Sequence, residues 1–280
     1  MEKQFELTDI LFEKLRDGEV IIGTHITCMD PLQTEIIGNA GFDYLWIDTE
    51  HTYMEKTVLI NHLIAARACR IPAFVRIPWN DQVLAKPVLD MGADGIIFPM
   101  IKTKEDAEYA VKSCMYPPYG FRGFGPRRST QFGKYSTQDY IKETHKKIVK
   151  LIQIETKEAV DNIDKIAALP DVGVIVIGPM DLSGAFGKLS QTKDPEIQNI
   201  YRYVAQHGRA AGKPVLVSTG SYDVENIRFW VSCGVNMITI GNEPGYLNEG
   251  LRNTLESFKS VMKEFEQKGT HFEVKRLNCD

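Results

Sequence analysis

Two short apolar runs that each lead to a carboxylate constrain this chain most. The runs are residues 151–154, followed at once by Glu155, and residues 174–177, followed four residues later by Asp181. Nearly unbroken apolar runs of this length are typical of strands buried on both faces of a parallel sheet. Residues 157–169 between them carry apolar side chains at helical spacing, and a strand–helix–strand unit makes its two strands parallel. Glu155 and Asp181 should therefore lie at the same sheet edge, as a hard-metal site or as an acid and base pair.

Similar runs recur along the 280-residue chain and give eight predicted strands in all. A helical segment follows nearly every one of them. The other six predicted strands are residues 20–26, 44–48, 73–78, 95–100, 214–219 and 237–241. This order predicts an α/β fold, the (β/α)8 or TIM barrel, which typically needs ~250 residues. A doubly wound sheet would need a glycine-rich turn after its first strand, and Gly23-Thr24-His25 does not provide one. We expect a single barrel domain over residues 1–268 and a polar tail over residues 269–280.

Composition narrows the class of protein. The net charge is −4 and no Lys/Arg cluster alternates with aromatic residues, so nucleic acid is not an expected partner. No apolar run reaches the ~18–20 residues of a membrane helix, and the first residues are too polar for a signal peptide. The 5 cysteines are odd in number and scattered, which argues against a disulfide scaffold. These features favour a cytoplasmic enzyme or binding domain.

Charged residues end several predicted strands, at the side where barrel enzymes carry their active sites. They are Asp48, Glu50, His51, Arg76, Glu155 and Asp181. The carboxylates of Glu155 and Asp181 suit Mg²⁺ or Mn²⁺, which prefer oxygen ligands. The turn from Gly178 to Asp181 leads into a helix and leaves the backbone N–H groups of Met180 and Asp181 available to a substrate carboxylate.

His51 and Arg76 each allow two interpretations. His51 is either a further metal ligand or a base that Asp48 or Glu50 orients. Arg76 lies inside an apolar strand and needs an anion nearby, which is either a protein carboxylate or a substrate enolate. No lysine lies inside a predicted strand, since Lys150 precedes the fifth one. Schiff-base chemistry is therefore less favoured than a metal-dependent route.

The chain resembles the HpcH/HpaI aldolase (citrate lyase β-like) family over roughly residues 18–265. Within that family it is most similar to the class II pyruvate-dependent aldolases of 4-hydroxy-2-oxo acids. Six motifs in order carry the resemblance: Trp46-Ile47-Asp48-Thr49-Glu50-His51, Arg76-Ile77-Pro78-Trp79-Asn80-Asp81, Asp90-Met91-Gly92-Ala93, Tyr116-Pro117-Pro118 with Arg122-Gly123, Gln153-Ile154-Glu155-Thr156, and Gly178-Pro179-Met180-Asp181-Leu182-Ser183.

The resemblance implies a reaction and a set of roles. The reaction is reversible cleavage of a 4-hydroxy-2-oxo acid to pyruvate and an aldehyde, through a metal-bound pyruvate enolate. The implied ion is Mg²⁺, Mn²⁺ or Co²⁺. Glu155 and Asp181 are implied to bind the metal, with Gln153 beside the ion. Arg76 is implied to contact the enolate, and His51, assisted by Asp90, to transfer the proton. The turn that contains Gly178, Met180 and Asp181 is implied to bind the pyruvate carboxylate.

The family also implies a homo-oligomer, a hexamer built as a trimer of dimers that exchange the last helix, here about residues 249–266. Relatives often have alanine where Met180 stands, so this bulkier side chain bears on which aldehyde the site accepts. Two other interpretations remain open. One is a related lyase for a CoA-linked or phosphorylated substrate, bound by the loops at residues 218–221 and 241–242. The other is a catalytically silent barrel that only binds a ligand.

Overall fold

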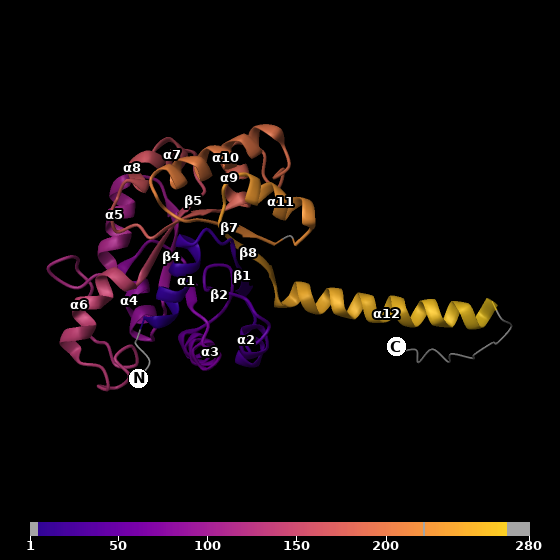
Figure 1. Ribbon diagram of the computed structural model, residues 1–280, viewed down its shortest axis with the longest axis horizontal. Coiled ribbons are helices and arrows are strands. Elements are labelled where there is room, and N and C mark those ends of the chain that lie inside the picture. The colour runs from indigo at the N-terminus through magenta and orange to yellow at the C-terminus, as the bar shows by residue number, and fades with distance from the viewer. Residues whose placement is uncertain (1–4, 221, 268–280) are drawn as a thin grey trace. The chain divides into compact units, whose positions relative to one another are not determined.

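The computed structural model of the chain is a closed barrel of eight parallel strands that pair in chain order, which confirms the predicted fold (Figure 1). The structure describes residues 5–220 and 222–267. The strands are β1 (Ile21–Ile26), β2 (Tyr44–Asp48), β3 (Ala73–Arg76), β4 (Gly95–Ile101), β5 (Val149–Ile154), β6 (Val174–Ile177), β7 (Val215–Thr219) and β8 (Met237–Asn242).

Helices occupy the connections and surround the strands, as Figure 1 shows. They are α2 (Pro31–Gly38), α3 (Lys56–Ala68), α4 (Gln82–Asp90), α5 (Lys104–Ser113), α6 (Thr137–Lys147), α7 (Lys157–Asp161), α8 (Ile163–Ala167), α9 (Pro179–Ala185), α10 (Pro195–Ala210) and α11 (Val224–Ser232). The single helix that we expected over residues 157–169 is thus two short helices, α7 and α8, which meet at Asn162. Residues 116–126 form no helix or strand, as their proline and glycine content predicts.

A helix before the first strand, α1 (Glu6–Arg16), was absent from our sequence-based assignment. Its leucines at positions 7, 11 and 15 recur every four residues and are all buried. Leu11 and Leu15 belong to the same apolar cluster as residues near the strand starts, including Ile21 and Val149. The helix therefore covers the amino-terminal end of the barrel, and the spacing of its leucines was the signal that could have revealed it.

The interior of the barrel changes from apolar to polar along the strands. Alternate residues of a strand face the interior. Near the strand starts these residues are apolar, as in the buried cluster that contains Tyr44, Phe74, Leu151, Val174 and Leu216. Near the strand ends the residues in phase with them are polar: His25, Asp48, Arg76, Gln153 and Ser218. The fold thus collects its polar groups at the carboxyl end.

The chain divides into two compact units, residues 1–242 and residues 243–280. The second unit contains α12 (Glu243–Gln267), which begins six residues earlier than the last helix that we expected. Apolar side chains that are exposed on this helix recur at spacings of three and four: Leu247, Leu251, Leu255, Phe258, Val261 and Phe265. Among the described residues, no helix is long and apolar enough to cross a membrane. A single domain over 1–268 stays a prediction, and the expected tail at 269–280 lies outside the described residues.

A test of the interior packing uses Gly23 of β1. A Cβ atom at this position would lie 2.3 Å from the ring of Tyr44. That ring cannot easily move, because it is fully buried and its hydroxyl is 2.9 Å from the Thr239 hydroxyl. We expect Gly23→Ala to lower the free energy of unfolding by ~1–3 kcal/mol through overpacking, measured by urea denaturation. Gly220→Ala is the matched control, since nothing lies within 4 Å of a Cβ at that position. Equal stability of the two variants would contradict this packing.

Candidate active site at the carboxyl end of the barrel

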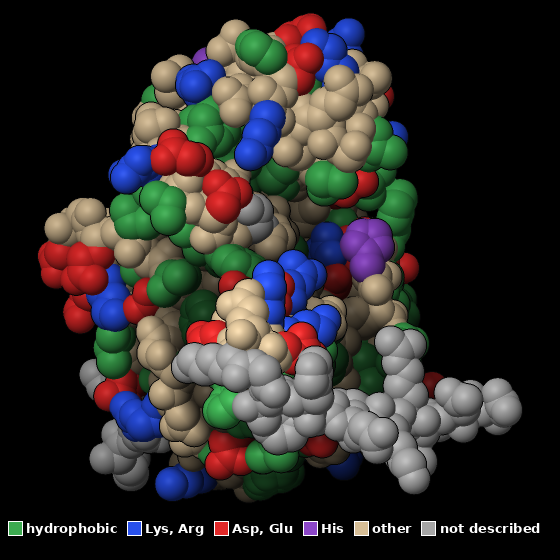
Figure 2. All heavy atoms as spheres, turned by 90° about the vertical axis from the view of Figure 1, so that its right-hand side faces the viewer, with side chains coloured by type: hydrophobic (Ala, Val, Ile, Leu, Met, Phe, Trp, Pro, Cys, Tyr) green, Lys and Arg blue, Asp and Glu red, His purple; other side chains and the backbone are tan. Residues whose placement is uncertain are grey.

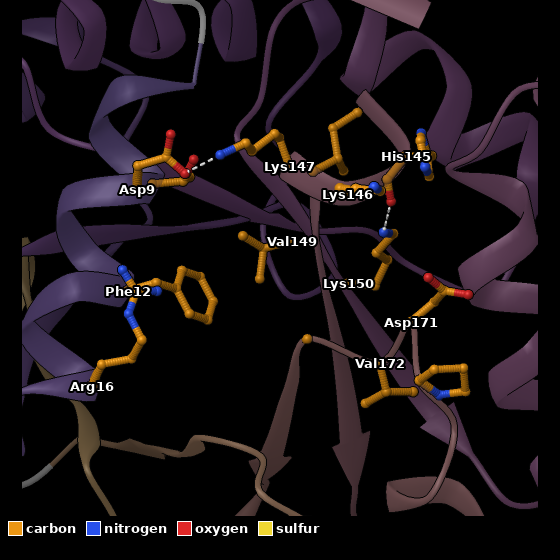
Figure 3. A pocket seen from close by; sticks show the side chains of 14 residues that line it. Asp9, Phe12, Arg16, His145, Lys146, Lys147, Val149, Lys150, Asp171 and Val172 are labelled. Atoms are coloured by element: carbon orange, nitrogen blue, oxygen red, sulfur yellow. Dashed lines mark hydrogen bonds and ion pairs between the residues drawn. The ribbon is translucent and has the colours of Figure 1, made fainter. Parts of the chain in front are cut away.

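A cavity of about 450 Å³ lies at the amino-terminal end of the barrel, away from the strand ends where the sequence predicts the site (Figure 3). It lies between α1 and the starts of β5 and β6. Its charges are engaged with the protein: the Lys147 ammonium lies 2.5 Å from the Asp9 carboxylate, and Lys150 donates a hydrogen bond to the carbonyl of His145. In barrels of this type the amino-terminal end contributes stability, whereas the loops at the carboxyl end carry the chemistry.

Lys150 corrects one expectation. Strand β5 begins at Val149, two residues earlier than predicted, so a lysine does lie inside a strand. Its buried side chain points to the amino-terminal cavity and not to the carboxyl-end rim (Figure 3). Burial lowers the pKa of Lys150. Because its ammonium lies at the far end of the barrel, it does not restore a Schiff-base site at the rim.

A buried guanidinium organises the rim. Arg76 ends β3, where it lies beside the last residue of β2, Asp48. Its Nε and Nη2 atoms donate to the two carboxylate oxygens of Asp48 at 2.9 and 2.6 Å, and Nη1 lies 3.0 Å from Glu50. The guanidinium carbon also lies 5.3 Å from the ring centre of Trp46 below it. Burial by itself would raise the pKa of Asp48, but the hydrogen bonds and charge of Arg76 outweigh it and lower that pKa.

Glu155 is buried just beyond the end of β5 and is held by two neighbouring strands. Its Oε1 accepts the backbone N–H of Met100 at 2.6 Å, and its Oε2 accepts a hydrogen bond from the Gln153 amide. Met100 has a φ of 56° at an irregularity in the pairing of β4 with β5, which directs its N–H toward this carboxylate. Gly178 at the end of β6 makes room, since a Cβ there would lie 2.9 Å from Oε2.

Negative charge accumulates around Glu155. Burial, and then the charges of Asp181 and Glu50, raise the pKa of Glu155 to about 7. Burial also raises the pKa of Glu50 to about 7, with Asp48 and Asp181 adding to the effect and Arg76 opposing it. Carboxylates that hold each other's pKa up in this way would be relieved by a bound cation.

The donors present fit a divalent cation. Glu155 and Asp181 offer carboxylate oxygens, and the buried Oε1 of Gln153 has no hydrogen-bond partner in the described structure. Over residues 5–220 and 222–267 no three His, Cys, Asp or Glu side chains come together as a complete metal site. A cation held by Glu155 and Asp181 would therefore take its other ligands from water or substrate, as Mg²⁺ commonly does.

Asp181 and Met180 lie in the first turn of α9, which begins at Pro179 with Gly178 as its N-cap. Backbone N–H groups in the first turn of a helix have no acceptor within the helix. The amides of Met180 and Asp181 are therefore directed to the same end of the barrel as Glu155. The sequence predicted these amides as a receptor for a substrate carboxylate, and that role stays a prediction.

His51 and Asp90 are not joined in the described chain. The His51 side chain is 64% exposed, and its Nε2 lies 3.7 Å from Glu50. The Asp90 carboxylate accepts a hydrogen bond from Arg122 at 2.7 Å, and no hydrogen bond or ion pair links the described His51 to it. Asp48, which the sequence suggested could orient His51, engages Arg76 instead. Assistance of His51 by Asp90 stays a prediction.

A second cavity of about 450 Å³ lies at the carboxyl ends of β6 and β7, and Met180 and Ser218 are among its lining residues. Lys193, from the connection between α9 and α10, also lines it. Lys193 thus adds a basic side chain to the cavity that the loop after β7 lines, a feature that only the structure provides. His25, also absent from the predicted site, lies behind Ser218 with its Nε2 2.8 Å from the serine hydroxyl.

Acidic and basic side chains are interspersed on the face shown in Figure 2, without a large region of one sign. Nucleic-acid-binding faces concentrate Lys and Arg, and this face does not. The expectation that nucleic acid is not a partner stays a prediction.

Comparison with known proteins follows from this geometry. A family model described as HpcH/HpaI aldolase/citrate lyase matches residues 22–246. The 5-keto-4-deoxy-D-glucarate aldolase of Enterobacter sp. (strain 638) is 35% identical over 243 residues, which cover 86% of this chain and 93% of that protein. An HpcH/HpaI aldolase/citrate lyase family protein from Burkholderia cenocepacia J2315 has a similar structure, with a TM-score of 0.83, 29% identity, and coverage of 89% of this chain and 99% of that one. The citrate synthase SbnG is also similar, with a TM-score of 0.78, 30% identity, and coverage of 90% and 98%.

The Asp48–Arg76 pair yields a stability prediction. Asp48→Asn removes the charge that compensates a buried guanidinium, and we expect a loss of ~3 kcal/mol in the free energy of unfolding at neutral pH. Because the folded-state pKa of Asp48 lies below its ordinary value of 3.8, its stabilising contribution is present above that pH and is lost as the pH falls through the folded-state pKa.

Asp94→Asn is the matched control. The Asp94 carboxylate accepts the Ala73 N–H at 2.9 Å, which an asparagine oxygen can also do, and burial raises the pKa of Asp94 to about 6. Loss of its charge should change the free energy of unfolding by less than ~1 kcal/mol. Urea denaturation at pH 7.5 measures both variants. Similar losses in the two would show that Arg76 does not depend on Asp48.

Proposed function

The chain belongs to the HpcH/HpaI aldolase/citrate lyase family, and we propose that it is a metal-dependent aldolase that reversibly cleaves a 4-hydroxy-2-oxo acid to pyruvate and an aldehyde. As an aldolase it is a carbon–carbon lyase. The observation that carries the proposal is the buried carboxylate of Glu155, whose pKa is raised to about 7 by burial first and then by the charges of Asp181 and Glu50. Such a site suits a cation and a chelating 2-oxo acid.

Substrate binding follows from the fixed groups of the rim. The first-turn amides of Met180 and Asp181 would receive the carboxylate of the 2-oxo acid. Glu155 and Asp181 would hold a divalent cation, which when bound acts as a Lewis acid toward the 2-keto group. Nη1 of Arg76 faces the same space and would donate to the keto oxygen, where negative charge develops as the enolate forms.

Proton transfer is assigned to His51. Its imidazole removes the proton of the 4-hydroxyl, and the electrons of that O–H bond form the aldehyde carbonyl as the C3–C4 bond breaks. The electron pair of the broken bond forms the C2=C3 double bond, and the π electrons of the 2-keto group move to its oxygen, where the charge of Arg76 stabilises them. A proton is then delivered to C3, which gives pyruvate.

Finer features of the proposal concern the ion, the assembly and the substrate. We take Mg²⁺, Mn²⁺ or Co²⁺ as the ion, because carboxylate oxygens and water are ligands that these ions accept. The exposed apolar residues of α12 would be covered in a homo-oligomer, for which a hexamer is our expectation. A cytoplasmic location stays a prediction. The first substrate to test is 5-keto-4-deoxy-D-glucarate, which names the activity of the Enterobacter relative.

A phosphorylated or CoA-linked substrate is the second candidate, and Lys193 is the observation that favours it. This lysine lines the carboxyl-end cavity together with Ser218 and Gly220, where barrels often bind phosphate. Asp223 and Glu225 line the same cavity, and their negative charges oppose a phosphate. Kinetics with an aldehyde acceptor and its phosphorylated form would separate the two: a higher kcat/KM for the phosphorylated form supports the second candidate.

The first test of the proposed function concerns the cation. Excess EDTA should abolish pyruvate release, and Mg²⁺, Mn²⁺ or Co²⁺ should restore it. Glu155→Gln and Asp181→Asn should each reduce turnover at least ~100-fold because each removes a charged ligand. The control is Asp161→Asn, an exposed carboxylate on α7, which should retain full activity. Undiminished turnover in EDTA, or borohydride trapping of substrate on a lysine, would contradict a metal-dependent route.

A second test separates enolate formation from aldol cleavage. Arg76→Ala should reduce both aldol cleavage and oxaloacetate decarboxylation by several hundred-fold, since loss of such a contact costs ~3–4 kcal/mol. Arg76→Lys keeps a charge opposite Asp48 and checks that the effect is not loss of the fold. His51→Ala should reduce aldol cleavage more than decarboxylation, which requires no hydroxyl proton to be removed. Equal losses in the two assays would remove His51 from its assigned role.

The third test concerns Met180, whose side chain is half exposed and lines the carboxyl-end cavity. An apolar, flexible thioether should favour small or apolar aldehydes. Met180→Ala enlarges the cavity, so kcat/KM for bulky aldehydes should rise relative to acetaldehyde by roughly tenfold, with little change in the KM for pyruvate. Leu189→Ala, an exposed residue nearby that does not line the cavity, is the control. An unchanged ratio of large to small aldehydes would place Met180 outside the acceptor site.

A further inference from the structure

His25 and Ser218 form a polar pair that the reaction described above does not use. His25 lies near the end of β1 and Ser218 near the end of β7, and both strands pair with β8. The imidazole contacts the Trp46 ring, with 5.3 Å between ring centres, and is almost completely buried. Its Nδ1 lies 2.8 Å from the carbonyl oxygen of Gly241 in β8, and its Nε2 lies 2.8 Å from the hydroxyl oxygen of Ser218.

These partners fix the direction of both hydrogen bonds. A carbonyl oxygen can only accept, so Nδ1 of His25 carries the proton and donates to Gly241. Burial, and to a smaller extent the charge of Arg76, lower the pKa of His25 to about 4, so the ring is neutral near pH 7 and Nε2 has a free lone pair. The Ser218 hydroxyl therefore donates its only hydrogen to Nε2. What remains on the serine oxygen is its capacity to accept.

The burial of the His25 imidazole argues against a nucleophilic role for Ser218. A histidine that activates a serine must take up its proton, and an imidazole that is buried and already difficult to protonate is a poor base at neutral pH. Ser218 is partly exposed and lines the carboxyl-end cavity next to Met180, which precedes the proposed metal ligand Asp181. An aldehyde that extends from the metal site past Met180 would therefore meet an oxygen that accepts a hydrogen bond.

We propose that His25 and Ser218 form a specificity-determining pair that selects aldehydes with a hydroxyl group on the carbon next to the carbonyl. Ser218 contacts that hydroxyl and accepts its hydrogen bond, and His25 acts as a positioning residue that holds the serine in the accepting orientation. A neutral hydroxyl is compatible with the carboxylates of Asp223 and Glu225, which line the same cavity. This inference rests on the proposed aldolase function.

The test compares glycolaldehyde with propanal, two acceptors of equal heavy-atom number that differ by a hydroxyl in place of a methyl group. With pyruvate as donor, the wild type should show the higher kcat/KM for glycolaldehyde. Ser218→Ala should lower the glycolaldehyde-to-propanal ratio by on the order of tenfold, the usual effect of one hydrogen bond, with an unchanged KM for pyruvate. His25→Phe keeps an aromatic ring against Trp46 and should lower the ratio similarly, because the serine can then rotate. Ser232→Ala, which removes an exposed hydroxyl on α11, should leave the ratio unchanged.

An unchanged ratio in Ser218→Ala would overturn the proposal, and this small substitution decides it even where His25→Phe folds poorly. A fall in Ser218→Ala without a fall in folded His25→Phe would overturn the role of His25. Oxaloacetate decarboxylation by the same preparations keeps the two levels apart. Wild-type protein that neither decarboxylates oxaloacetate nor uses any aldehyde contradicts the proposed function, whereas an active enzyme whose ratio is insensitive to Ser218 contradicts only this inference.

Discussion

The carboxyl-end site depends on one buried positive charge. The guanidinium of Arg76 lies above an interior filled with aromatic and aliphatic side chains, where an unpaired cation would be costly. Asp48 satisfies it with two hydrogen bonds and Glu50 with a third contact, so one side chain fixes the ends of two adjacent strands. Because the planar fork matches a carboxylate, this arrangement also sets the direction in which Nη1 faces the substrate space.

The rest of the carboxyl-end site carries an excess of negative charge. The carboxylates of Asp48, Glu50 and Glu155 act on the guanidinium of Arg76, and Asp181 adds to the negative charge around Glu155. The imidazole of His25 is neutral near pH 7. Low dielectric surroundings strengthen the repulsion among them. The high pKa values of Glu50 and Glu155 express this excess. A bound divalent cation would offset this negative charge and would allow an anionic 2-oxo acid to bind beside it. The family to which the chain belongs is consistent with such chemistry.

The same interior provides both stability and selectivity. Its lower part is filled by large apolar side chains, against which Leu11 and Leu15 of α1 pack. Its upper part changes to polar residues that hydrogen-bond across strands, such as Arg76 with Asp48 and His25 with Ser218. In a buried place each of these groups has few possible partners, so its hydrogen bonds have fixed directions.

The sequence alone determined the barrel, the order of its strands and most of the rim. Apolar runs of the right length with helical segments between them allow few other folds, and strands that run parallel must present Glu155 and Asp181 at one end. Other features depended on tertiary structure, because they join residues that are distant in the sequence. Asp48 is only three residues from His51 in the sequence, yet its carboxylate pairs with Arg76, because β2 lies beside β3 in the barrel.

Tertiary structure also brought to the site residues that the sequence provided no reason to select. His25 and Ser218 are 193 positions apart and meet only because β1 and β7 both flank β8 in a closed barrel. Lys193 lies in a connection without regular pattern and reaches the cavity only through the fold. We predicted that Lys150 precedes the fifth strand, whereas the structure places it inside β5. Pairing with β4 begins at Val149, a boundary that the apolar pattern of the sequence does not mark. Local pattern fixes which way a strand runs and where it roughly ends, whereas side-chain partners are decided by the closure of the barrel.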